Sequence, residues 1–240
     1  LSTPYDVKSA KFLNKLGVKI FKTASADLID YNLHNYLAKL KKPVIISTGM
    51  SSINDVKKTV QIYRKYKNFN IYLLHCVSNY PCSLKSINLN VLNSLKKFGF
   101  IVGYSDHSND IMIPCLAVSA GSRIIEKHFT LNKGLKGPDH KASFNTRELK
   151  KMVNQIRKTE LVMGKKIKKI QPEELEMSKI SKKSLYFNKN KKKGSKVKST
   201  DLVSLRPGLG ISPFSINKFI GKKLKKDIKK NQIIKYNLIF

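Results

Sequence analysis

Apolar and polar residues alternate in two patterns along residues 1 to about 165. Short apolar runs rich in β-branched side chains are separated by longer stretches with apolar residues at helical spacing. This arrangement is typical of βα units around a parallel sheet. The predicted strands are 18–24, 43–49, 70–77, 100–106 and 122–129. The stretches between these strands, and residues 145–164, are predicted to be amphipathic helices.

A change in composition after residue 165 predicts a domain boundary. Residues 166–183 are rich in lysine and contain Pro172, which is typical of a linker, and residues 184–240 carry short β-rich runs broken by Gly and Pro. A closed (β/α)8 barrel needs eight strands, whereas the first domain offers five. We therefore expect an α/β fold with a barrel truncated at its N-terminus over residues 1–165, a linker, and a small β-rich domain over 184–240. The chain starts at Leu1, within what reads as a domain.

The chain is strongly basic, with 48 Lys and Arg against 15 Asp and Glu and a net charge of +33. Such a charge would normally suggest a nucleic acid or an anionic membrane surface as partner. The lysines are spread along the whole chain, however, and no RNA-binding or helix-turn-helix motif accompanies them. We expect a solvated surface and neither partner, and a phosphorylated substrate suits the positive charge equally well.

Three further features of the sequence bear on the location of the protein. No apolar run reaches the roughly 18 residues that a membrane-spanning helix needs, and there is no secretory signal. The three cysteines are too few and too irregularly spaced for a disulfide framework or a zinc knuckle. We expect a cytoplasmic protein.

Two predicted strands end on histidines in matching contexts. Side chains alternate along a strand, so Ser105 and His107 lie on one face, as do Glu126 and His128. If the strands are neighbours in a parallel sheet, the two imidazoles converge at its carboxyl edge and would suit a divalent metal with open positions. A single buried histidine is more often a hydrogen-bonded core residue, and that interpretation stays open for each of them.

Other polar residues follow the earlier strands. Lys22 ends a strand and precedes Ser25 and Asp27, which presents a cation, a hydroxyl and a carboxylate together; an ordinary surface lysine is the alternative. Ser47 and the glycine at 49 suit an anion or a simple helix cap.

The chain resembles the sialic acid synthase family, which condenses phosphoenolpyruvate with an N-acylated hexosamine. The resemblance rests on seven motifs in the order of the family: LSTPYD, FKTASAD, KPVIISTGMSS, LLHCVSNYP, GYSDHS, IIEKHFTLNKGLKGPDHKAS and RPGLGISP. It implies a TIM barrel followed by an antifreeze-like (SAF) domain. It also implies that a catalytic glutamate lies upstream of Leu1, so that the 240-residue chain alone is expected to be inactive.

The resemblance assigns roles to individual residues. The implied metal ligands are His107 and His128, with Mn²⁺ as the ion and Mg²⁺ or Co²⁺ as alternatives. The implied phosphoenolpyruvate contacts are Lys22, Ser25, Ser47, Ser78 and Ser105. The implied sugar contacts are Asp27, Tyr80, Asp139 and Arg206. Most relatives carry Glu at position 27 and many carry Thr at 77, so those contacts differ here.

The implied reaction joins C3 of phosphoenolpyruvate to the aldehyde of the open-chain sugar, giving a nonulosonic acid and phosphate. The GPDH sequence at 137–140 favours neuraminic or legionaminic acid synthases over pseudaminic acid synthases. The resemblance further implies a domain-swapped homodimer in which Arg206 reaches the partner's barrel; without it, Arg206 reads as a turn-flanking surface residue. The alternatives are a synthase of eight- or seven-carbon ulosonic acids, which the RPGLGISP segment argues against, and a non-catalytic carbohydrate or anion binder.

Overall fold

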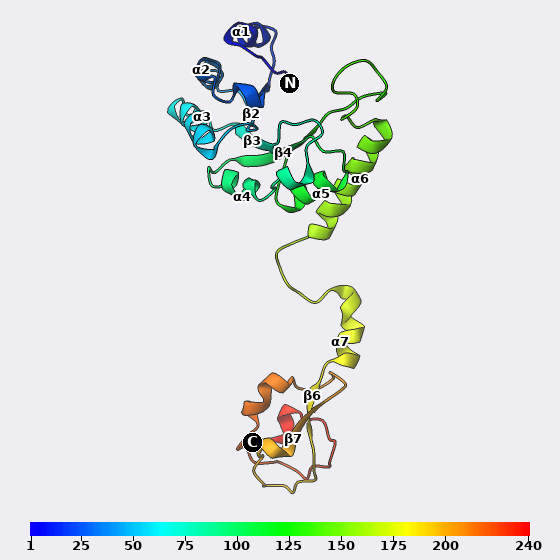
Figure 1. Cartoon of the computed structure of the whole chain (residues 1–240). Coiled ribbons are helices and arrows are strands. Elements are labelled where there is room, and N and C mark those ends of the chain that lie inside the picture. Colours follow the sequence, from blue (N-terminus) through cyan, green and yellow to red (C-terminus); the bar gives the residue numbers. More distant parts are fainter. The chain divides into compact units, whose positions relative to one another are not determined.

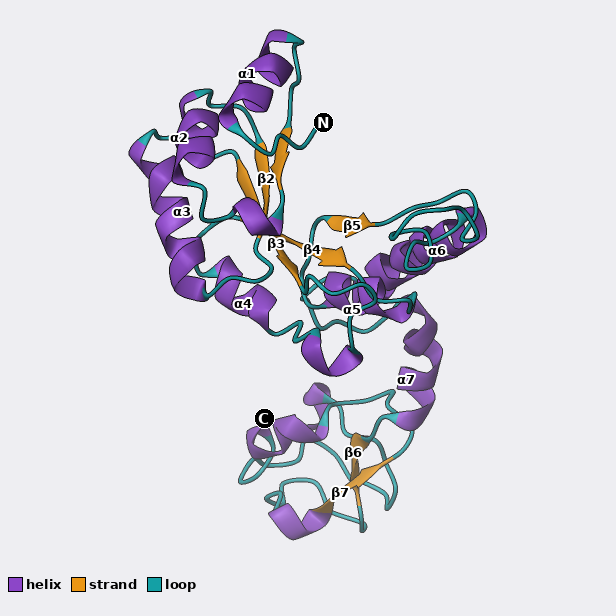
Figure 2. Cartoon of the chain, turned by 45° about the horizontal axis from the view of Figure 1, so that its top comes forward, coloured by secondary structure: helices purple, strands orange, loops and turns teal.

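A five-stranded parallel sheet organises the first part of the chain (Figures 1 and 2). The computed structural model describes residues 1–240 and divides into two units, Leu1–Lys165 and Lys166–Phe240. The strands follow one another in the order of the sequence: β1 (Phe21–Thr23), β2 (Val44–Ser47), β3 (Ile71–Cys76), β4 (Ile101–Asp106) and β5 (Ile125–Lys127). All five predicted strands are present, with shorter bounds.

Helices lie before, between and after the strands, as in a (β/α)8 barrel. They are α1 (Val7–Lys15), α2 (Tyr31–Lys39), α3 (Ile53–Lys65), α4 (Val91–Lys96), α5 (Met112–Ser119) and α6 (Thr146–Met163). Figure 2 shows α1 to α4 in succession along one side of the strands. Side-chain caps fix several starts, such as the capping box between Ser52 and Asp55 at α3.

The core of this unit lies between the helices and one face of the sheet. Leu33, Leu37 and Val60 from the helices pack with Phe21 and Leu73 from the strands, and all five are fully buried. The opposite face therefore forms the inner side of the curved sheet. The five βα units are part of a barrel and do not close into one within this chain.

Helix α1 was not among the predicted elements. It precedes the first predicted strand and so lies outside the stretches between strands that were predicted to be helical. Its sequence is amphipathic, and its N-cap Asp6 accepts a hydrogen bond from the Ser9 N–H. Strand β5 is also shorter than predicted, because the chain after Lys127 leaves β4 and pairs with another segment: Phe129 forms a β-bridge with Phe144.

The second unit has its own core. Strands β6 (Ser184–Phe187) and β7 (Leu202–Leu205) pair antiparallel, and short 3-10 helices and isolated bridges complete the fold. Its buried side chains include Leu185, Phe187 and Phe219.

The predicted linker is partly helical. Within 166–183, helix α7 (Leu175–Ser181) follows a 3-10 turn, and its Lys179 carbonyl accepts a hydrogen bond of 2.7 Å from the Gly208 N–H. This helix is therefore tied to the second unit. None of the helices of the chain combines the length and the apolar character that a membrane crossing requires.

Candidate active site

The register of the strands places the predicted site residues on the inner face of the sheet. Cys76 pairs with Ser105, and Ser105 pairs with Glu126. Lys22 pairs with Ile45, which shares its face with Ser47 two residues later. Paired residues of neighbouring strands point to the same side, so these side chains all face inward at the carboxyl ends of the strands.

The two histidines converge there. The ring centroids of His107 and His128 are 5.5 Å apart, and the rings meet edge to face. His107 is buried, whereas about a third of the His128 side chain is exposed. The convergence expected from strand alternation is present.

The closest polar neighbour of each histidine lies on the Nδ1 side and leaves Nε2 for a further ligand. A carbonyl oxygen only accepts, so His107 Nδ1 donates to the Val77 carbonyl at 2.6 Å, and Nε2 keeps its lone pair, with Ser105 Oγ 3.4 Å away. His128 Nδ1 lies 3.8 Å from Asp139 Oδ2. Burial lowers the pKa of His107, which favours the neutral imidazole that metals bind.

The donor set fits a metal with only two protein ligands. Second-shell acceptors on the far nitrogen are typical of metal-binding histidines. No group of three or more His, Cys, Asp or Glu side chains in the chain is arranged to hold a metal ion. A closed four-ligand structural zinc site is therefore excluded at this position, and an open site with room for water and substrate oxygens fits.

Tyr80 covers the histidine pair. Its ring centroid is 4.2 Å from that of His107 and 5.3 Å from that of His128. Burial raises the pKa of its hydroxyl, so the group stays protonated and can donate a hydrogen bond. About half of the residue is exposed, which leaves it accessible to a substrate above the histidines.

Lys22 and Glu126 meet across the interior. They come from β1 and β5, the two edge strands, yet Lys22 Nζ is 3.4 Å from Glu126 Oε2. In a flat sheet these strands would be about 19 Å apart, so the curvature of the sheet brings them together. Ser105 Oγ donates to the other oxygen of Glu126 at 2.8 Å.

Glu126 was not predicted as a site residue. The only available signal was that it shares a face with His128, one of the predicted ligands. Its pairing with Lys22 depends on the curvature of the whole sheet, which local sequence patterns do not specify.

The predicted hydroxyl groups gather around Gly49. The Gly49 N–H donates to Ser25 Oγ at 3.1 Å, and a Cβ at position 49 would lie 2.4 Å from Ser78 Oγ. Any residue with a Cβ at position 49 would displace these hydroxyls, so their arrangement requires glycine. Ser47 Oγ is buried and has no hydrogen-bond partner within the chain.

The remaining predicted sugar contacts are dispersed. Asp27 ends a 3-10 turn after β1; one of its carboxyl oxygens is buried without a partner, and burial raises its pKa. Asp139 lies beside His128 and is largely exposed. Arg206 is in the second unit, where its Nε donates to the Ser181 carbonyl at 2.8 Å.

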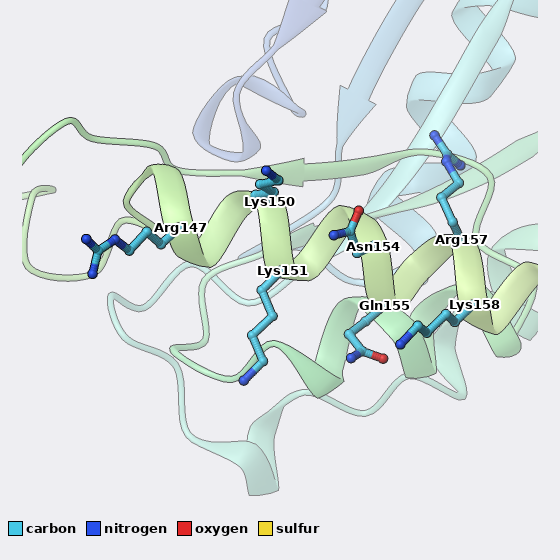
Figure 3. A pocket seen from close by; sticks show the side chains of 7 residues that line it. All are labelled: Arg147, Lys150, Lys151, Asn154, Gln155, Arg157 and Lys158. Atoms are coloured by element: carbon cyan, nitrogen blue, oxygen red, sulfur yellow. The ribbon is translucent and has the colours of Figure 1, made fainter.

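A basic hollow of about 530 Å³ lies on α6, away from these residues (Figure 3). Figure 3 shows side chains that leave the helix in different directions, with Arg157 on the side opposite Lys151. It contains no histidine, cysteine or carboxylate, and its lining residues are Arg147, Lys150, Lys151, Asn154, Gln155, Arg157 and Lys158. This hollow is an open helix surface and lacks groups for acid–base or metal chemistry.

Several known proteins are similar to this chain in sequence or in structure. The chain is 41% identical over 238 residues to the N,N'-diacetyllegionaminic acid synthase of Campylobacter jejuni, covering 98% of this chain and 71% of that protein. It is 36% identical over 235 residues to the pseudaminic acid synthase of the same organism, covering 98% and 68%. A crystal structure of the N-acetylneuraminic acid (sialic acid) synthetase of Leptospira borgpetersenii, in complex with citrate, superposes with a TM-score of 0.69 at 39% identity, covering 73% of this chain and 61% of that one.

The family assignment follows from these matches and from the domain profiles. Residues 182–239 match the SAF domain and residues 1–168 match the NeuB family. The predicted fold class, part of a TIM barrel followed by a SAF domain, and the resemblance to sialic acid synthases are both confirmed. The chain belongs to the NeuB family.

Proposed function

We propose that this chain binds phosphoenolpyruvate and an N-acylated hexosamine and serves their condensation to a nonulosonic acid with release of phosphate. Relatives are named as synthases of legionaminic and pseudaminic acids, which supports an enzyme of this class. The observation that carries the proposal is the convergence of Lys22, the Ser105–Glu126 pair and the two histidines on one inner face.

Phosphoenolpyruvate is the ligand that we assign to the cationic and hydroxyl groups. Lys22 is largely buried, and its ammonium group suits a carboxylate or phosphate. Ser47 Oγ lacks a partner, and Ser25 and Ser78 approach Gly49 beside it. Ser105 donates to Glu126 in this structure, and its hydroxyl can turn toward an incoming anion.

We assign a divalent metal to Nε2 of His107 and Nε2 of His128. The Val77 carbonyl orients the first ring, and Asp139 lies beside the second. Bound there, Mn²⁺ would supply Lewis-acid polarisation of the sugar's aldehyde oxygen, with Mg²⁺ and Co²⁺ as alternative ions. Burial lowers the pKa of His107, which favours the neutral ring that this role requires.

The proposed reaction forms one carbon–carbon bond. C3 of phosphoenolpyruvate attacks the aldehyde carbon, whose oxygen takes a proton to become a hydroxyl. Water adds at C2, and phosphate leaves, so that C2 becomes the ketone. Tyr80, Asp27, Asp139 and Arg206 are the proposed sugar contacts, with a 2,4-diacetamido hexose or N-acetylmannosamine as acceptor.

Calorimetric titration tests the two ligand assignments directly. We expect stoichiometric phosphoenolpyruvate binding that weakens roughly ten- to hundredfold in Lys22→Met, because a hydrogen-bonded charge contributes about 1.5–3 kcal/mol. Lys19→Met, an exposed lysine beside the same strand, is the matched control and should bind like the parent. Equal affinity in both variants would contradict the anion site.

Manganese binding is measured separately. The double variant His107→Ala/His128→Ala should lose stoichiometric Mn²⁺ binding, followed by the electron paramagnetic resonance signal of free Mn²⁺. Retention of one tightly bound ion by the double variant would overturn the metal assignment while leaving the phosphoenolpyruvate result intact.

A further inference from the structure

An ion pair joins the two histidine-bearing strands on the face opposite the site. Asp106 and Lys127 are register partners on β4 and β5, one residue before His107 and His128. Lys127 Nζ donates to Asp106 Oδ2 at 2.8 Å, and the side chains are 2% and 0% exposed. They point toward the helices, whereas their neighbours point into the site.

The pair also fixes the backbone on both sides of His107. The second oxygen of Asp106 accepts from the Ser108 N–H at 3.0 Å, and Lys127 Nζ donates to the Ser108 carbonyl. His107 is thus held between two residues that Lys127 contacts directly.

Lys127 acts in the same way on the second histidine. Its ammonium lies 4.1 Å from the ring centroid of Phe144, a cation–π contact. The Phe144 N–H donates to the His128 carbonyl at 2.9 Å. One lysine therefore contacts residues that hold the backbone at both histidines.

Stability alone gives no reason for this pair. Taking two charges out of water costs free energy, and well-packed apolar residues in the place of a buried ion pair are often at least as stable. A buried ion pair does impose a defined geometry, because its hydrogen bonds are directional and each charged group must keep its partner.

We infer that Asp106 and Lys127 are positioning residues that set the spacing of His107 and His128 for the metal. The inference rests on the proposed metal site and identifies the residues that fix its geometry. Outer-shell partners of metal ligands commonly contribute ten- to hundredfold in affinity. We expect Lys127→Met and Asp106→Asn to weaken Mn²⁺ binding by that factor in chains that remain folded.

The matched control breaks a buried lysine–aspartate pair elsewhere. Lys191 pairs with the buried Asp201 at 2.6 Å in the second unit, so Lys191→Met should lower stability without changing Mn²⁺ affinity. All variants are titrated below their unfolding transitions, determined by circular dichroism. If Lys127→Met does not fold, Asp106→Asn still tests the inference, because it keeps the side-chain volume and a hydrogen-bonding oxygen.

A metal-free measurement separates this inference from the proposed function. Long-range ¹H–¹⁵N spectra of chains labelled at histidine report the tautomer and surroundings of His107 and His128. Their signals should shift in Asp106→Asn and stay unchanged in Lys191→Met. Unchanged histidine signals and unchanged Mn²⁺ affinity in a folded variant would overturn the inference. If the parent binds no Mn²⁺, the metal assignment fails, and the histidine spectra still decide whether the pair positions the rings.

Discussion

His34 should make the stability of the first unit depend on pH. The ring is fully buried, and both nitrogens are engaged: Nε2 donates to the Asp27 carbonyl at 3.1 Å, and Nδ1 accepts from the Tyr63 hydroxyl at 2.9 Å. Burial lowers the pKa of His34 from 6.5 to about 4. A second proton would occupy the lone pair that Tyr63 uses and would place an unpaired charge in the core.

The magnitude follows from the difference between the two states. In the unfolded chain His34 titrates near 6.5, and in the folded chain near 4, so only the unfolded chain binds the proton between these values. Stability is therefore full above pH 6.5 and falls as the pH decreases toward 4. At about 1.4 kcal/mol per pH unit the whole effect is roughly 3 kcal/mol, of which about 2 kcal/mol is lost between pH 7 and pH 5.

The assay is urea unfolding of the chain at pH 7 and pH 5, followed by circular dichroism. His34→Gln is the comparison, because glutamine does not titrate in this range. We expect this variant to be less stable than the parent at pH 7 but to lose about 2 kcal/mol less on acidification. Carboxylates elsewhere titrate alike in both chains and cancel. Equal losses in the two chains would refute the reasoning.

Two further predictions concern the anion site and the assembly. Gly49→Ala should weaken phosphoenolpyruvate binding about tenfold, because its methyl group would displace the hydroxyls of Ser25 and Ser78; calorimetry measures this, and Gly134→Ala, whose methyl would meet only the end of a loop side chain, should bind like the parent. The homodimer implied by the resemblance, with Arg206 serving the partner, predicts sedimentation at twice the chain mass of 27.3 kDa, and a monomer at micromolar concentration would contradict it.

Sequence reasoning succeeded where a local pattern determines the outcome. All five strands of the sheet were predicted, because buried parallel strands are apolar runs flanked by amphipathic helices. Helix α1 was not predicted, because it precedes the first predicted strand and helices were expected only between and after the strands, although its sequence is amphipathic and capped by Asp6. Strand β5 was predicted too long, because the pairing of Phe129 with Phe144 involves a segment distant in the sequence.

In the candidate site, too, the features that depend on a local pattern could be predicted, and those that depend on distant segments could not. The convergence of His107 and His128 follows from the alternation of side chains in two neighbouring strands, and this alternation can be read from the sequence. The contact between Lys22 and Glu126 requires the curvature of five strands, which no short segment encodes. The pairing of Asp106 with Lys127 was not predicted, although the same alternation that places the histidines on one face of the strands places these two residues on the other.

The register of β4 and β5 lets each strand end carry both site residues and one partner of the buried ion pair. In residues 105–107 and 126–128 the first and last residues face the site on the inner side of the sheet. The middle residues, Asp106 and Lys127, face the helices. A shift of either strand by one residue would turn its histidine toward the apolar core and its charged residue into the site. The buried ion pair forms only in the native register, since Asp106 and Lys127 are then directly opposite one another. The same interaction that positions the imidazoles therefore also disfavours the register in which they would be lost.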